Sequence, residues 1–174
     1  MACSLNTLAG IAGSCESNQG GIIEVYINHF DQIDEVTVTS DKISAIALKG
    51  SGSKFKVYNF RRNTGSLTST YTIDPANGVN FVTSDLSLVF AKQDTAKRIE
   101  ISALSLDDLA IIVKDANGKF WYLGKDEPVQ ASAAAAQTGT ARTDGNNYTI
   151  TLQDTSLTLP YEVDASIVEA LLDR

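Results

Sequence analysis

Alternation of apolar and polar residues is the strongest pattern along this chain, and it is typical of β-strands with one buried face. The segments that follow it most clearly are 34–40, 42–48, 54–60, 67–73, 85–90 and 148–152. The apolar run at 22–27 predicts a short buried strand. The sequence therefore predicts a mainly β fold, an antiparallel β-sandwich or barrel.

Turn residues separate these segments. Asn-Gly pairs at 77–78 and 117–118 predict tight turns, because both residues tolerate the left-handed backbone region. The second turn joins two predicted strands, 109–114 and 119–123. Residues 61–66, which include Asn63, Thr64 and Gly65, predict a hairpin between strands 54–60 and 67–73.

One helix is predicted at about 94–106, and we expect it to flank the β-sandwich or barrel. Asp94 is a suitable N-cap, because its carboxylate accepts hydrogen bonds from free backbone amides. Ala96, Ile99, Ala103 and Leu106 recur at helical spacing and form the predicted buried face. A short C-terminal helix is predicted at 164–172, capped by Asp164.

The remaining organisation is simple. The Ala-rich stretch 130–142 is compatible with a helix, by propensity, or with an extended strand that has a flexible middle, and both stay open. No internal repeat and no long linker divides the chain. We expect a single β-rich domain over 1–174, with an extended N-terminal arm at 1–21.

Composition and charge limit the classes of function that this chain can have. A chain of 174 residues that is 43% hydrophobic is long enough for a real core. No apolar run reaches the length of a membrane span. The net charge of −7 disfavours a duplex-binding role, which requires a basic face. Lys54, Lys56, Arg61 and Arg62 are interpreted as a solvated edge of the predicted hairpin.

Catalytic chemistry has little support. His29 is the one histidine, and it ends a strand, where a capping or surface role is the simpler interpretation. Residues 50–54 place glycines near a lysine but lack the spacing of a phosphate-binding loop. Trp121 and Tyr122 are adjacent, so on a strand they point to opposite faces and make a poor sugar-binding platform. We expect no enzyme, no cofactor and no metal site.

Two cysteines, Cys3 and Cys15, do not define a disulfide framework. They could pair across a short loop. The N-terminal block lacks the features of an export signal, so we expect two reduced thiols in a protein made in the cytoplasm.

Four features in a fixed order resemble small virion structural proteins of tailed bacteriophages of Bacteroidota, crAss-like phages included. The first is the block Met1-Ala2-Cys3, Cys15, Gly20-Gly21-Ile22 and Val25-Tyr26 up to Phe30. The second is the strand 86–92 running into the helix at 94–106. The third is the hairpin AIIVKDANGKFWYLG, and the fourth is the polar segment 137–141 followed by GNNYTITL.

This resemblance implies a tail-tube-like fold and a structural role in the virion. The protein would form a homo-oligomeric ring of the tail tube, tail hub or neck–tail junction, of sixfold or twelvefold symmetry, beside other tail or neck proteins. Sheets of neighbouring subunits would join into a barrel around the channel for DNA. An acidic lumen would let the genome pass without specific binding.

Three polar segments are the expected subunit contacts: the arm, the tip 61–66 and the stretch 130–145. In the arm, Leu5, Leu8 and Ile11 would otherwise be exposed. The other candidate contact residues are Arg61, Arg62, Asn63, Thr138 and Arg142. The alternative functions are a head-decoration or head–tail joining protein, and a soluble β-sandwich module that binds carbohydrate.

Overall fold

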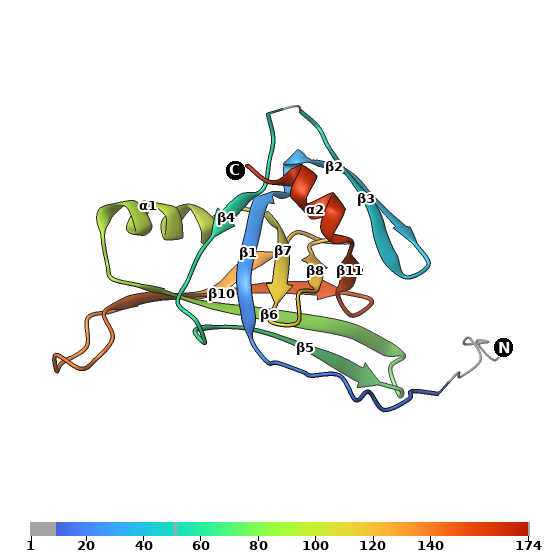
Figure 1. Cartoon of the computed structure of the whole chain (residues 1–174), viewed down its shortest axis with the longest axis horizontal. Helices are drawn as coiled ribbons and strands as arrows, with labels where there is room; N and C mark the ends of the chain where they lie inside the picture. The colour runs from blue at the N-terminus through green and yellow to red at the C-terminus, as the bar shows by residue number, and fades with distance from the viewer. Residues whose placement is uncertain (1–9, 51, 174) are drawn as a thin grey trace.

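The computed structural model describes residues 10–50 and 52–173, and it is mainly β, as predicted (Figure 1). A seven-stranded sheet has the order β2-β3-β11-β8-β7-β1-β4. Its strands are β1 (Ile22–His29), β2 (Ile33–Thr39), β3 (Lys42–Leu48), β4 (Lys56–Tyr58), β7 (Leu109–Asp115), β8 (Phe120–Leu123) and β11 (Tyr161–Val163). All its pairings are antiparallel except that of β11 with β3.

A four-stranded antiparallel sheet packs against the first, in the order β5-β6-β10-β9. Its strands are β5 (Gly65–Asp74), β6 (Val79–Ala91), β9 (Gln130–Gln137) and β10 (Asn147–Ser156). β6 is one long strand, and Figure 1 shows the β5–β6 hairpin reaching out to one side of the molecule. The Ala-rich segment forms β9, so the extended alternative is the correct one.

Two apolar cores give the molecule three layers. The first core lies between the sheets and includes Val25, Leu88, Ile111 and Ile150. The second core covers the opposite face of the seven-stranded sheet and includes Tyr26, Phe55, Ile112 and the α2 (Ala165–Leu171) residue Val168. β1 and β7 are therefore buried on both faces, which explains their nearly continuous apolar sequences.

Helix α1 (Thr95–Leu104) confirms the predicted N-cap, because the Asp94 side chain accepts a hydrogen bond from the backbone amide of Lys97. The predicted buried face is wrong. Ile101 and Leu104 pack on the first core, whereas Ile99 is 57% exposed and Leu106, just beyond the helix, is 89% exposed. The helix carries two apolar arcs, and spacing alone does not tell which one meets the sheets.

The predicted hairpin across 61–66 is also wrong. β4 pairs with β1 in the large sheet, whereas β5 pairs with β6 in the small one, so residues 61–64 carry the chain from one sheet to the other. The crossing is tight: a Cβ added to Gly65 would lie 2.8 Å from side-chain atoms of Ile22 and Phe60. The alternation predicted for segment 54–60 is confirmed, because Phe55 lies in the second core and Tyr58 packs against the first.

The predicted short C-terminal helix is α2, and Asp164 is its N-cap residue, although its side chain makes no capping hydrogen bond. Both Asn-Gly turns are confirmed, with positive φ at Gly78 and Gly118. Trp121 and Tyr122 lie on opposite faces, as predicted. Tyr122 is buried, while the partly exposed Trp121 donates its indole N–H to Asp115 at 2.9 Å.

Candidate functional site: the outward face of the four-stranded sheet

The outward face of the four-stranded sheet is the broad surface that no further layer covers among the described residues. Alternate residues of β6 and β10, such as Leu86, Leu88 and Ile150, point into the first core. The residues between them point outward and are mainly small and hydroxylated. They include Ser66, Thr68, Thr70, Thr72, Thr83, Asp85, Ser87, Thr149, Thr151, Gln153 and Thr155, with Val79, Phe81 and Val89 interspersed.

No lysine or arginine occurs in any of the four strands, all of which lie in the described part of the chain. The charged side chains of the outward face are acidic. Asp85 accepts a hydrogen bond from the Gln153 amide at 2.8 Å. At the β5–β6 turn, hydrogen bonds from the side chain and backbone of Asn77 hold the pKa of Asp74 below its usual value. This face therefore stays negative at neutral pH.

The lysines of the large sheet lie in ion pairs instead. Lys42 and Lys119 both contact Glu162, at 3.1 and 2.7 Å, and Lys114 lies 3.7 Å from Glu24. The hydrogen bond from Lys119 is the main reason that the pKa of Glu162 is lowered. Lysines thus occur in strands of the large sheet, whereas none occurs in a strand of the small one.

Both edges of the small sheet are open within the described residues. β5 pairs with β6 and β9 pairs with β10, and neither has a strand on its other side. β9 is exposed along nearly all its length, and four of its side chains are consecutive alanines, 133–136. A row of unpaired backbone groups flanked by methyl side chains is a surface to which another strand can add.

One carboxylate lies on the inner side of this sheet. Asp154 is 2% exposed and accepts a hydrogen bond from the Gly124 amide at 3.1 Å. Burial is the main cause of its raised pKa, and the nearby acids Asp126 and Glu127 add to it. The buried Tyr122 hydroxyl has no hydrogen-bond partner among the described residues, and burial raises its pKa as well.

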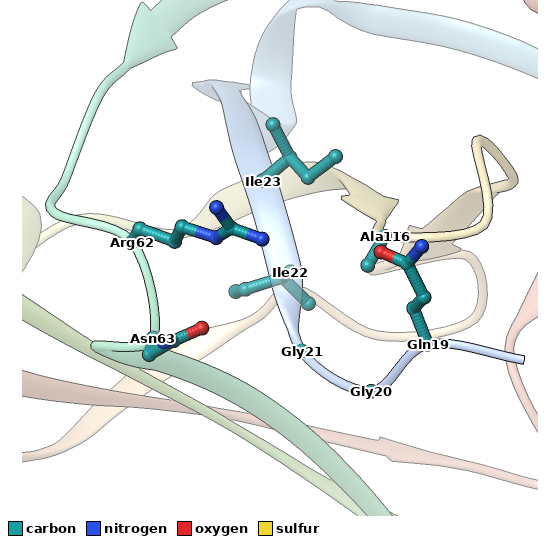
Figure 2. Close-up of a pocket in the computed structure, with 8 residues that line it drawn as sticks. All are labelled: Gln19, Gly20, Gly21, Ile22, Ile23, Arg62, Asn63 and Ala116. Carbon is teal, nitrogen blue, oxygen red and sulfur yellow. The ribbon is translucent and has the colours of Figure 1, made fainter.

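Two of the sequence-predicted contact residues line a cavity of about 340 Å³ at the start of β1. Figure 2 shows Arg62 and Asn63, from the segment between the sheets, facing Ile22 and Ile23 across this cavity, with Gln19 and Ala116 on its other side. The structure therefore brings the tip 61–66 next to the base of the arm. Their role as subunit contacts stays a prediction.

The other predicted contact residues do not line this cavity. Thr138 and Arg142 are exposed in the β9–β10 loop, which the Asp144 carboxylate organises by accepting hydrogen bonds from the amides of Thr140 and Ala141, both at 2.7 Å. Ile11 is fully exposed in the arm, and Arg61 is exposed beside Arg62. Leu5, Leu8 and Cys3 lie outside the described residues, and Cys15 is an exposed free thiol.

Other chemistry is sparse in the part of the chain that the structure describes. His29 lies 3.2 Å from Asp107 at the surface, where both side chains are substantially exposed. No group of three or more potential metal ligands occurs within 10–50 and 52–173. None of the helices described is long and apolar enough to cross a membrane.

The outward face was not among the residues singled out from the sequence. The sequence does carry a signal for this face: all four segments that build the small sheet lack lysine and arginine, and those that form β5, β6 and β10 alternate Ser or Thr with apolar residues over part of their length. No protein-family model matches this chain, and a search of curated proteins found no match either.

Proposed function

We propose that this protein is a structural subunit of a phage virion that assembles into a ring of the tail or the neck–tail junction, with its four-stranded sheet lining the channel for DNA. The observation that supports this proposal is the absence of lysine and arginine from the four strands that form the outward face. A wall that surrounds moving DNA must avoid phosphate contacts, because each lysine or arginine that binds a phosphate adds affinity and friction.

The sheet edges provide the means of closing such a ring. If β5 of one subunit pairs with β9 of the next, every small sheet becomes part of one continuous barrel. This contact is heterologous, because it joins two different surfaces, and repeated rotation closes it into a ring. The alanines of β9 keep side chains short where the neighbouring strand would approach.

Cryo-electron microscopy of the intact particle, with this sequence traced in the density, tests the proposal. We expect closed rings around the axial channel, with Thr70 and Thr151 facing the lumen. A position on the capsid surface would instead support the head-decoration alternative. Rings with the small sheet on their outer wall would contradict the assignment of the lumen.

Lysines placed on the proposed lumen wall test the electrostatic argument separately. In Thr70→Lys/Thr151→Lys rings, each subunit would contribute two cations, and we expect DNA retention in the channel that falls steeply as salt is raised. The matched Thr70→Gln/Thr151→Gln variant is similar in size but neutral, and its rings should release DNA as the unsubstituted rings do. Equal release by both variants would overturn the channel role of this face.

A further inference from the structure

Asn117, in the β7–β8 turn, binds the base of the arm through its side chain. The Gln19 amide donates to Asn117 Oδ1 at 2.9 Å, and Asn117 Nδ2 donates to the Gln19 carbonyl at 3.1 Å and to Asn18 Oδ1 at 3.0 Å. We call these three hydrogen bonds the arm latch. Figure 2 shows Gln19 beside Ala116, the residue directly before Asn117. One side chain thus binds both backbone groups of Gln19, as the facing residue of an antiparallel strand does.

Little else attaches the described part of the arm to the body. Within residues 10–21, the one further hydrogen bond to the body runs from the Ala116 amide to the Gly21 carbonyl, at 3.0 Å. Every residue in this range is exposed, so burial of apolar surface contributes little to the attachment. The arm latch therefore fixes the direction in which the residues before Asn18 leave the body.

The arm latch requires an amide at position 117. A carboxamide presents a donor and an acceptor side by side, whereas a carboxylate can only accept hydrogen bonds. With a carboxylate, one oxygen would still accept from the Gln19 amide, but the other would face the Gln19 carbonyl oxygen with no proton between them. Asn18 can rotate its side-chain amide to donate instead, whereas the Gln19 carbonyl is fixed by the backbone. The contact with Gln19 therefore becomes repulsive.

The residue after Asn117 makes this amide chemically labile. Gly118 has no side chain, and a Cβ built on it would have nothing within 4 Å, so its backbone nitrogen is sterically accessible. That nitrogen can attack the carbonyl carbon of the Asn117 side chain, which forms a succinimide ring as ammonia leaves. Water then opens the ring to aspartate or isoaspartate. Overall one water is consumed, one ammonia is released, and a carboxylate replaces the amide.

We propose that Asn117 is a deamidation site, at which conversion of the side-chain amide to a carboxylate releases the base of the arm. The turn itself tolerates aspartate, because Asp-Gly and Asn-Gly are both preferred in tight hairpin turns. The attached arm in turn protects Asn117, because attack by Gly118 requires the side chain to rotate out of the arm latch. The site lies within a single chain and goes beyond the proposed ring function.

The second Asn-Gly pair provides an internal control. Asn77 is exposed in the β5–β6 turn, and its side chain donates to Asp74 within the same turn. It makes no hydrogen bond to the part of the arm that the structure describes. Deamidation at Asn77 should therefore be independent of the arm, and Asn77→Asp is the matched control for Asn117→Asp.

Peptide mass spectrometry during incubation at alkaline pH measures the deamidation rate of both asparagines in the same molecules. The full chain is compared with a chain that lacks residues 1–19 and therefore the partners of Asn117 in the arm latch. We expect the deletion to raise the ratio of the Asn117 rate to the Asn77 rate several-fold. A ratio that is the same in both chains would overturn the protection of Asn117 by the arm, and with it the inference.

Hydrogen exchange of the Gln19 amide measures release of the arm, because this amide donates to Asn117. We expect Asn117→Asp to lose the protection of Gln19, and Asn77→Asp to keep it. Protection of the β7 amides in the same spectra shows that each variant is folded. A nitroxide on Cys15, in a Cys3→Ser chain, should become more mobile in Asn117→Asp alone. Full protection of Gln19 in Asn117→Asp would overturn the inference.

The yield of rings keeps this inference apart from the proposed function. If the arm is a subunit contact, Asn117→Asp should form fewer rings than Asn77→Asp. Release of the arm with equal yields of rings would support the deamidation site and reject the arm as a contact. Rings in normal yield, together with a Gln19 amide that stays protected in Asn117→Asp, would overturn the deamidation site and leave the ring function unaffected.

Discussion

At the scale of single residues, Asp154 is the side chain whose environment differs most from what its type prefers. It faces the interior from β10, and burial raises its pKa. The folded state therefore binds a proton more tightly than the unfolded state does. Between the unfolded pKa, about 3.9, and the raised folded pKa, stability must increase as the pH falls.

We expect Asp154→Asn to stabilise the protein at neutral pH, because the amide oxygen still accepts the Gly124 hydrogen bond and no buried charge remains. The difference in unfolding free energy between variant and unsubstituted protein should shrink as the pH falls through the folded pKa of Asp154. Urea unfolding at a series of pH values measures this difference. A gap that is constant with pH would show that Asp154 has no raised pKa.

At the scale of elements, the short strand β4 and helix α2 hold each other in place. The Phe55 amide donates to the Leu171 carbonyl at 3.0 Å, and the Asp173 amide donates to the Phe55 carbonyl at 3.1 Å. Lys56 and Asp173 form an ion pair beside them. The Phe55 ring is fully buried in the second core, which α2 covers.

Phe55→Ala should destabilise the protein by about 3–5 kcal/mol, because it leaves a cavity beneath α2. Lys54→Ala, at the exposed neighbouring position, should change stability by less than about 0.5 kcal/mol. Denaturant unfolding compares the two variants. A small loss for Phe55→Ala would mean that α2 adds little to the second core.

Helix α1 shows how far a pattern identifies an element. The N-cap and the approximate bounds follow from local chemistry, so Asp94 and the segment after it were predictable. The buried face was not, because the helix has two apolar arcs, and its orientation is set where the chain leaves β6. There Lys92 has a positive φ of 64°, and its amide donates to the carbonyl of Asn146, a residue distant in the sequence that lies directly before β10.

At the scale of the whole molecule, the arm is the segment least attached to the body. Every described residue from Gly10 to Gly21 is exposed, and its first long-range hydrogen bonds join Asn18 and Gln19 to Asn117 in the β7–β8 turn. Figure 1 shows the arm leaving the start of β1 and, in this view, running below β5 toward the side where the β5–β6 turn lies. This placement suits a contact with another subunit.

Deleting residues 1–19 should abolish rings and leave the far-ultraviolet circular dichroism of the β fold unchanged, because the deleted residues add no strand to either sheet among those described. Cys15→Ser, in the full chain, is the matched control and should leave assembly intact, since its thiol is exposed and free. Electron microscopy counts the rings. Rings that persist after the deletion would show that the arm is not a subunit contact.

The sequence by itself determined the elements. Alternation, Asn-Gly turns and a capping aspartate act between residues close in the chain, so most strands, both turns and both helices follow from local chemistry. The tertiary structure decided how they combine: residues 61–64 cross between sheets, β11 joins by a parallel pairing, and α1 turns its predicted buried face to solvent. The outward face and its open edges exist only because β5, β6, β9 and β10 meet, and such long-range pairing is set by the fit of whole layers rather than by any one segment's pattern.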